Sequence, residues 1–462
     1  MTPNAKKAWE IECETIQSSV PVILEEEEQG WSECSDSERE DNLWAENYWR
    51  SNVPGSGATE HVIVAAIQDT ENMGYDVTEA EKLIEAGTRA RETGDHAEMA
   101  RLAARVFLEL NRAPKLPDHP YWNYVLYERF EQYEAAVELP VYPFTKDQAE
   151  YERLNTLGWT AQICGGALGT AIEGYTGENL RKAFGEIRGY VRTPNTYNDD
   201  ITYELAFLEA LRQAREKLTA ADIADQWVAL VPTGWSAEDR ALRNLKLGIY
   251  PPESGRLNNP YREWIGAQMR GAVCGMVAPG DVRKAARYAF MDGSVSHAGN
   301  GILGEVFNAI LTSLAYVKSD LREIVREAVS LIPADSEYAS VVRFALERCE
   351  ESEDWQAAWK PCEARYARYN WIHAYPNACA EVVALWFGNG DFDRTMHIIA
   401  MEGCDVDCNA AQIATAVAVA GDREIASSWT DPIGDELITY MRKIKKLSIR
   451  ELAAETAELG SL

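Results

Sequence analysis

Apolar residues recur at spacings of three and four through most of the chain, which is the period of an α-helix with a buried face. Loops rich in glycine, proline and asparagine separate these segments after residue 150. The segments run over 206–218, 223–230, 262–276, 282–291, 300–316, 321–331, 338–349, 378–387 and 392–400. The alternation typical of strands is scarce, with 21–24 and 61–67 as the candidates. The pattern predicts an all-α fold.

The first 60 residues differ from the rest in charge. They contain 14 acidic and 4 basic side chains, including an unbroken run of four glutamates. Low hydrophobicity with high charge is typical of disordered segments, so we expect 1–60 to be poorly ordered. Three tryptophans, Trp31, Trp44 and Trp49, indicate that part of this segment docks on the main body.

The next 90 residues predict a helical appendage. A helical pattern over 82–93 is broken at Gly94 and resumes over 97–111, which indicates a helix, a tight turn and a second helix. We therefore assign 61–150 to an N-terminal helical hairpin and 151–462 to one large helical domain.

Composition narrows the class of protein. The chain has 462 residues, is 46% hydrophobic and carries a formal net charge of −29. Such a charge disfavours nucleic-acid backbones and anionic membranes as partners, so direct nucleic-acid binding is unlikely. No apolar run approaches the ~20 residues of a membrane span, and the N-terminus lacks a secretory apolar region. With 9 cysteines and no CxxC pair, we expect a soluble cytoplasmic protein with reduced thiols.

Two acidic pairs each open a helix-like run. Asp405 and Asp407 precede the apolar run 412–420, and Asp199 and Asp200 precede another helical segment. A helix start favours negative charge, but close buried carboxylates repel each other and lose solvation. Either pair alone also fits an ordinary N-cap. Together they lead us to predict that the two helix starts meet around a hard divalent cation, with Mg²⁺ as the expected ion.

Glycine-rich stretches add further candidates. Small residues over 165–174 permit close backbone or ligand approach, and Glu173 is a carboxylate within this stretch. Polar and glycine residues over 261–270 and 296–301 are able to line a ligand pocket. The alternatives are helix packing for the first stretch and a structural role for His297.

The order of four motifs is more specific than any one of them. In chain order they are Gly165-Gly-Ala-Leu-Gly-Thr-Ala-Ile-Glu-Gly174, Asn198-Asp-Asp-Ile201, Ser296-His-Ala-Gly-Asn-Gly301 and Gly403-Cys-Asp-Val-Asp-Cys-Asn409. Together they resemble the ADP-ribosylglycohydrolase family, in its bacterial branch similar to the dinitrogenase-reductase-activating glycohydrolases. The resemblance covers about residues 75 to 455.

The resemblance implies a compact multi-helix domain that holds one or two Mg²⁺ ions in a cleft. It implies hydrolysis of the N- or O-glycosidic bond between ADP-ribose and a protein or small molecule. The metal ligands that it implies are Asn198, Asp199, Asp200, Asp405, Asp407 and Cys408. The catalytic residues that it implies are Glu173 and Asp407. The substrate-binding residues that it implies are Tyr261, Gly266, His297, Asn300 and Gly301.

Four positions depart from the family pattern. Gly166 stands where the family has Asp, and Asn198, Ile201 and Val406 stand where it has Thr. An Asn carbonyl still suits Mg²⁺, whereas Ile and Val offer no ligand, and Cys408 is a soft ligand that suits Mg²⁺ poorly. All four aspartates remain, which favours metal binding.

Two other functions are compatible with these substitutions. The chain could be an N-ribosidase acting on a nucleoside-like small molecule, because the altered positions could serve another leaving group. It could also be a non-catalytic ADP-ribose-binding or structural homologue. Assays on a substrate panel would separate the first, and calorimetry with Mg²⁺ and ADP-ribose the second.

Overall fold

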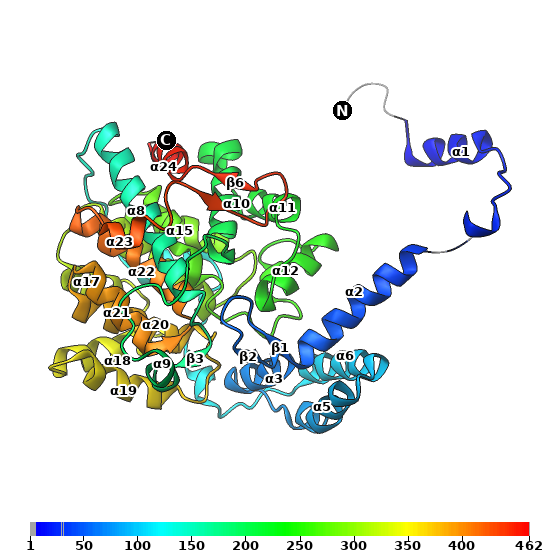
Figure 1. The fold of residues 1–462 in the computed structure, drawn as a ribbon, viewed down its shortest axis with the longest axis horizontal. Coiled ribbons are helices and arrows are strands. Elements are labelled where there is room, and N and C mark those ends of the chain that lie inside the picture. Colours follow the sequence, from blue (N-terminus) through cyan, green and yellow to red (C-terminus); the bar gives the residue numbers. More distant parts are fainter. Residues whose placement is uncertain (1–5, 29, 31, 462) are drawn as a thin grey trace.

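A computed structural model describes residues 6–28, 30 and 32–461, and these residues form mainly helices (Figure 1). The N-terminal helices are α1 (Ala8–Ser18), α2 (Ser32–Trp49), α3 (Val62–Asn72), α4 (Thr78–Glu81), α5 (Ile84–Thr93), α6 (His96–Arg112) and α7 (Phe130–Ala136). The following helices are α8 (Gln148–Gly169), α9 (Gly177–Phe184), α10 (Asp199–Ala214), α11 (Ala220–Leu230), α12 (Ser236–Lys246), α13 (Glu253–Arg256), α14 (Gly271–Met276), α15 (Val282–Gly293) and α16 (Asn300–Ala315). The last helices are α17 (Leu321–Ser330), α18 (Glu337–Glu351), α19 (Trp355–Tyr366), α20 (Ala374–Gly388), α21 (Phe392–Glu402), α22 (Val406–Gly421), α23 (Ser427–Thr430) and α24 (Ile449–Gly460).

Strands are short and form two-stranded antiparallel ribbons. They are β1 (Ser51–Asn52) with β2 (Thr59–Glu60), β3 (Tyr175–Thr176) with β4 (Gly403–Cys404), and β5 (Leu437–Ile438) with β6 (Lys446–Leu447). Single 3-10 turns occur at Glu26–Glu28, Pro120–Asn123, Arg215–Lys217 and Gln268–Arg270. The predicted all-α fold is confirmed.

Both candidate strands are wrong. Residues 21–24 form no strand, and their side chains are exposed. Residues 62–67 begin helix α3, because Ile63 and Ile67 lie one helical turn apart and are both buried. In a segment whose residues are almost all apolar, the spacing of the apolar positions does not distinguish a buried helix from a buried strand.

The predicted helix, turn and helix of the appendage are present as α5 and α6. Helix α5 ends at Gly94, whose φ of 69° is in the left-handed region that glycine favours. Asp95 then caps α6 by accepting a hydrogen bond from the backbone N–H of Glu98 at 3.0 Å. The division of the chain at residues 60 and 150 stays a prediction.

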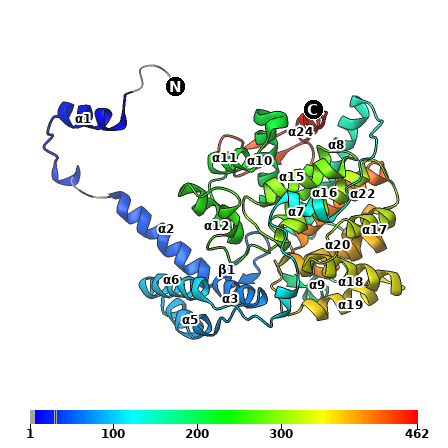
Figure 2. The same cartoon turned by 180° about the vertical axis from the view of Figure 1, so that it is seen from behind.

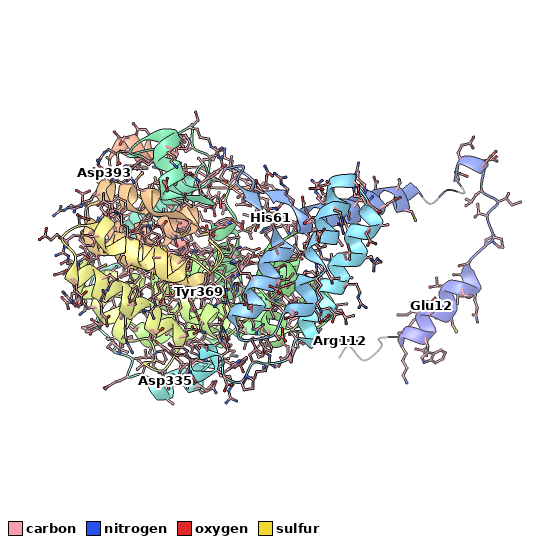
Figure 3. The ribbon with its side chains drawn as sticks, turned by 90° about the horizontal axis from the view of Figure 1, so that it is seen from below. Glu12, His61, Arg112, Asp335, Tyr369 and Asp393 are labelled. Atoms are coloured by element: carbon pink, nitrogen blue, oxygen red, sulfur yellow. The ribbon has the colours of Figure 1, made fainter. Side chains whose placement is uncertain are left out.

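The acidic N-terminal segment contains helices, and only its last part docks. Helix α1 has no buried residue and projects away from the body, as the position of Glu12 in Figure 3 shows. The opposite view in Figure 2 shows the same arm, with the end of α2 against α3 and α6. There Trp49 is buried and its indole N–H donates to the Met99 carbonyl at 2.9 Å, while Trp44 stacks on Trp235. Trp31 lies outside the described residues.

The body of the molecule is organised by the crossing of α8 and α22. Both helices are largely buried, and their backbones touch at glycines of α8. A Cβ at Gly165 would lie 2.4 Å from the Ala410 carbonyl oxygen, and one at Gly169 would lie 2.1 Å from the Asp407 Cα. The missing side chains thus let the start of α22 rest on the end of α8. No helix in the described part of the chain is long and apolar enough to cross a membrane.

We predict that Gly165→Ala lowers the free energy of unfolding by about 1–3 kcal/mol, because the methyl group would collide with rigid backbone of α22. Gly158→Ala is the matched control in the same helix and interface. Its Cβ would meet only side-chain ends, 3.2–3.4 Å away, and alanine favours the helix by about 0.5–1 kcal/mol. Urea unfolding of both variants measures the difference. Equal stability of the two variants would contradict the close backbone contact.

Candidate metal centre

Five carboxylates are placed by the ends of three helices. Glu173 follows the end of α8, where its backbone N–H still bonds to the Gly169 carbonyl at 3.0 Å. Asp199 and Asp200 are the first two residues of α10. Asp405 is the N-cap of α22, and Asp407 is the second residue of that helix. Because helix starts carry partial positive charge, both acidic pairs lie where backbone dipoles favour them.

The two helix starts meet, as the sequence predicts. The Asn198 amide nitrogen Nδ2 donates to Asp407 Oδ2 at 3.3 Å, although the residues are 209 positions apart. The Cys408 thiol donates to Asp200 Oδ1, also at 3.3 Å. One ligand atom from each of Asp405, Asp407 and Cys408 lies within 4.8 Å of the others. The side chains therefore converge on one small volume.

This convergence disfavours ionisation of the acids. Burial raises the pKa of Asp199 to about 6, and the charge of Asp407 adds to the shift. Burial and then the Asp407 charge also raise the pKa of Asp200 and of Asp405 well above the usual range. The pKa of Glu173 rises for the same two reasons. Among described residues, no Lys or Arg nitrogen lies within 4.0 Å of these five carboxylates.

Three oxygens in the cluster lack a hydrogen-bond partner among the described residues. They are Asp200 Oδ2, Asp405 Oδ1 and Asp407 Oδ1, and all three are buried. An unpaired buried carboxylate oxygen is costly, so this arrangement is poorly stabilised by the protein alone. Carboxylate oxygens are the preferred ligands of Mg²⁺ and similar cations. The side chains present therefore fit a divalent metal.

The substituted positions have defined places. Asn198 Oδ1 accepts the backbone N–H of Asp200 at 2.7 Å, so the amide oxygen serves as the N-cap of α10. Ile201 and Val406 are buried apolar residues. A Cβ at Gly166 would lie 3.3 Å from Asn198 Nδ2, so this glycine faces the cap. The role of Asn198 as a metal ligand stays a prediction, with its oxygen already engaged.

The candidate substrate residues lie inside the protein. The Tyr261 hydroxyl donates to the Val62 carbonyl at 3.0 Å. Asn300 Nδ2 donates to Glu263 Oε1 at 3.0 Å, and a Cβ at Gly301 would lie 2.3 Å from the Arg262 carbonyl. All these groups are occupied by contacts within the protein, and their role toward a substrate stays a prediction.

His297 and Gly266 lie together beside a carboxylate. A Cβ at Gly266 would lie 1.9 Å from Glu238 Oε1 and 2.9 Å from His297 Cε1. His297 Nδ1 is 2.7 Å from the Ser296 hydroxyl, whereas its buried Nε2 has no hydrogen-bond partner among described residues and lies 3.9 Å from Glu238 Oε1. Burial, with Arg270 nearby, lowers the His297 pKa well below its usual range. This shift favours the neutral imidazole.

Two residues that no motif marks also border the aspartates. Burial raises the pKa of Glu238 to about 7, with Arg270 opposing and Asp199 adding to the rise. Burial and then the Asp199 charge raise the pKa of Tyr440, whose ring lies 5.5 Å from that of Tyr197. A single Glu or Tyr in an unremarkable run carries no sequence signal, so only the folded chain places them here.

Comparisons with known proteins found one family model that matches most of the chain. A family model described as ADP-ribosylglycohydrolase matches residues 148–460. An uncharacterized protein of Archaeoglobus fulgidus is 24% identical over 196 residues, which cover 40% of this chain and 63% of that protein. The chain thus spans less than two thirds of this curated relative. A solved structure titled "ADP-ribosylglycohydrolase-related protein complex" is 18% identical, with a TM-score of 0.47, and covers 68% of this chain and 99% of its own.

The raised pKa values predict how the stability of the metal-free protein depends on pH. In the folded protein these carboxyl groups keep their protons up to a higher pH than in the unfolded protein, where their pKa is about 4. The free energy of unfolding therefore falls as the pH rises above about 4. The fall continues to about pH 6 for Asp199 and to a higher pH for Asp200 and Asp405. Asp405→Asn removes one acid and should stabilise the metal-free protein more at about pH 8 than at about pH 5.

Urea unfolding in the presence of a chelator measures this effect. The exposed Asp118 supplies the control, since Asp118→Asn removes an acid that lies outside the cluster. A stabilisation by Asp405→Asn that is the same at both pH values would show that the cluster is not under electrostatic strain.

Proposed function

The chain belongs to the ADP-ribosylglycohydrolase family, and we propose that it hydrolyses the glycosidic bond between ADP-ribose and a protein side chain or small molecule. We propose further that the reaction needs a divalent cation, with Mg²⁺ as the ion expected for oxygen ligands. The observation that carries this proposal is the convergence of Asp200, Asp405 and Asp407, with Asp199 under the influence of the Asp407 charge, on a volume without a basic side chain within ion-pair distance in the described structure.

The aspartates would hold the cation and set the local potential. Asp200, Asp405 and Asp407 each have an oxygen that is free to act as a ligand. When bound, the cation would supply positive charge that offsets the carboxylates and polarises a nearby water. Glycosidic cleavage passes through an oxocarbenium-like state, which a surplus of negative charge stabilises. The remaining acids of the cluster provide that surplus.

Glu173 is suited to take the proton of the attacking water. It lies at the edge of the cluster, where the charges of Asp407 and Asp405 act on it. Burial and these charges raise the Glu173 pKa, so its carboxylate is a stronger base than one in solvent. Its position after α8, rather than on either acidic helix start, leaves it available for proton transfer while the aspartates hold the ion.

We predict that Asp407→Ala abolishes both Mg²⁺ binding and turnover, because Asp407 lies at the start of α22 and accepts a hydrogen bond from Asn198 at the start of α10. Calorimetry measures the binding, and release of ADP-ribose from an ADP-ribosylated peptide or a small ADP-ribosyl compound measures the turnover. Asp118→Ala is the control and should retain both. Turnover by the Asp407→Ala variant would refute the assignment.

Glu173→Gln should separate proton transfer from metal binding. We expect turnover to fall by about 10²–10⁴-fold, the usual contribution of a general base, with Mg²⁺ affinity little changed. The same calorimetry and release assay provide both values. Loss of Mg²⁺ binding in this variant would instead make Glu173 a ligand, and full activity would remove it from the mechanism.

A further inference from the structure

We propose that residues 51–60 hold the Glu173 carboxylate in its orientation and are needed for turnover but not for cation binding. This segment, the strap, comprises β1, β2 and the turn between them. It lies outside residues 148–460, which the family model matches, so the family domain does not include it. The inference rests on the proposed function, because it concerns the residue proposed there as the general base.

The strap contacts the Glu173 loop on the side of α8. Gly55 has a φ of 103°, and a Cβ there would lie 2.7 Å from both the carbonyl oxygen and the methyl carbon Cγ2 of Thr170. Thr170 directly follows Gly169, the residue that rests against Asp407. The absent side chain thus lets the strap lie directly on the end of α8, beside its crossing with α22.

The strap also contacts the loop beyond Glu173. The Tyr175 hydroxyl donates to the Ser56 carbonyl at 3.1 Å. A Cβ at Gly174 would lie 2.6 Å from the Ala58 Cβ, and Ala58 is buried. Contacts before and after Glu173 therefore leave this loop little room to shift, and the Glu173 side chain stays buried beneath them.

Other parts of the body hold the strap in place. The Arg192 guanidinium, in the segment before α10, donates to the Gly55 carbonyl. Glu60, at the end of the strap, is buried and accepts the Trp235 indole N–H at 2.9 Å. Trp235 is the N-cap of α12, so the strap lies beside both α12 and β3 (Figure 1). Because these anchors lie outside the Glu173 loop, the strap is able to hold that loop from without.

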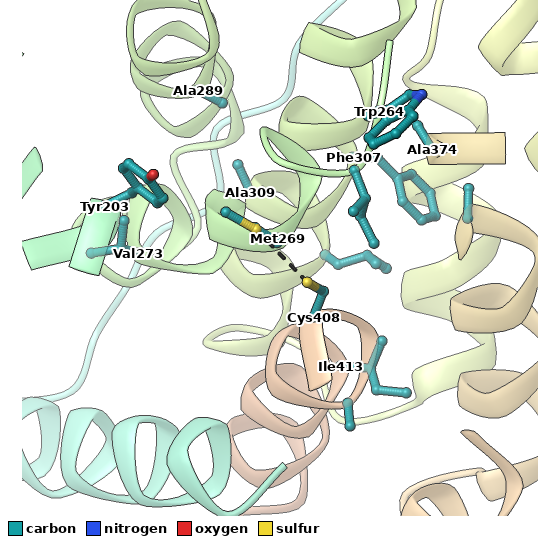
Figure 4. Packing of buried hydrophobic residues seen from close by; sticks show 14 of the residues in the cluster. Tyr203, Trp264, Met269, Val273, Ala289, Phe307, Ala309, Ala374, Cys408 and Ile413 are labelled. Carbon is teal, nitrogen blue, oxygen red and sulfur yellow. Dashed lines mark hydrogen bonds between the residues drawn. The ribbon is translucent and has the colours of Figure 1, made fainter. Parts of the chain in front are cut away.

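The metal-binding acids do not depend on the strap in this way. Asp405 and Asp407 belong to the start of α22, where the Cys408 sulfur lies 3.7 Å from the Met269 sulfur in the core (Figure 4). The positions of these acids are set by packed helices, whereas Glu173 lies in the loop between α8 and β3. Loosening the strap would therefore let the Glu173 carboxylate turn while the aspartates stay in place.

Two glycines in the turn of the strap provide a matched test. Gly55→Ala places a methyl group against Thr170, whereas Gly57→Ala adds the same group where no heavy atom of the described chain lies within 4 Å. Both glycines have positive φ, so both variants carry backbone strain. We expect Gly55→Ala to lower kcat by about 10–100-fold with unchanged Mg²⁺ affinity, because a small misplacement of a reacting group is costly. Gly57→Ala should keep the parent kcat.

A double-mutant cycle separates the positioning of Glu173 from a general distortion. In the Glu173→Gln background the strap has no general base to orient, so Gly55→Ala should lower the remaining kcat by less than about 2-fold. An equal loss of kcat in both backgrounds overturns the inference. Tyr175→Phe removes only the hydroxyl that bonds to the strap and should show the same dependence on Glu173. Where Gly55→Ala does not fold, an unchanged kcat in Tyr175→Phe overturns the inference.

The two proposals fail in different ways. If the parent releases ADP-ribose and Gly55→Ala does so equally fast, the strap positions nothing and the proposed function stands. Loss of Mg²⁺ binding in Gly55→Ala also overturns the inference, because the strap would then hold the metal centre itself. If the parent releases no ADP-ribose from any substrate, the proposed function is refuted, and this inference falls with it.

Discussion

The backbone contact between α8 and α22 is the constraint on which the site depends. Where Gly169 lies against Asp407, the absence of a side chain lets the start of one helix rest on the end of the other. This contact brings Glu173 beside Asp405 and Asp407, in spite of the repulsion between their charges. The extensive apolar core around both helices holds them in that position, because separating the acids would require separating α8 from α22.

Other buried acids in the molecule show by contrast what is unusual about the cluster. Glu204 accepts hydrogen bonds from Gln162 at 2.7 Å and from Gln412 at 3.1 Å, and Glu381 accepts one from Asn308 at 3.1 Å. In the core, amide side chains thus stabilise isolated carboxyls. Glu204 and Glu381 still keep one oxygen each without a donor, as Asp200, Asp405 and Asp407 do. The acids at the helix ends differ in lying close to one another, where burial and their mutual charges raise their pKa values together.

Local patterns predicted the helical fold and the acidic helix starts well. Asn198 and the aspartates after it follow the sequence preferences of an N-cap, so the start of α10 could be read directly. The helix over residues 62–67 could not be predicted from the sequence, because the burial of this apolar segment depends on tertiary packing. The partners of Tyr261 were likewise hidden, since its hydroxyl bonds to a backbone group 199 positions away. Contacts between distant residues without a shared motif, such as Glu238 near Asp199, leave no signal in a single sequence.

The small β3–β4 ribbon has a mechanical consequence. Tyr175 pairs with Cys404, and the Gly174 N–H bonds to the Cys404 carbonyl at 3.0 Å, so the loop after Glu173 is tied to the residue before Asp405. A shift of one loop therefore pulls the other with it. The ribbon thus fixes the separation of Glu173 and Asp405 by backbone hydrogen bonds, independently of the side chains of the two acids.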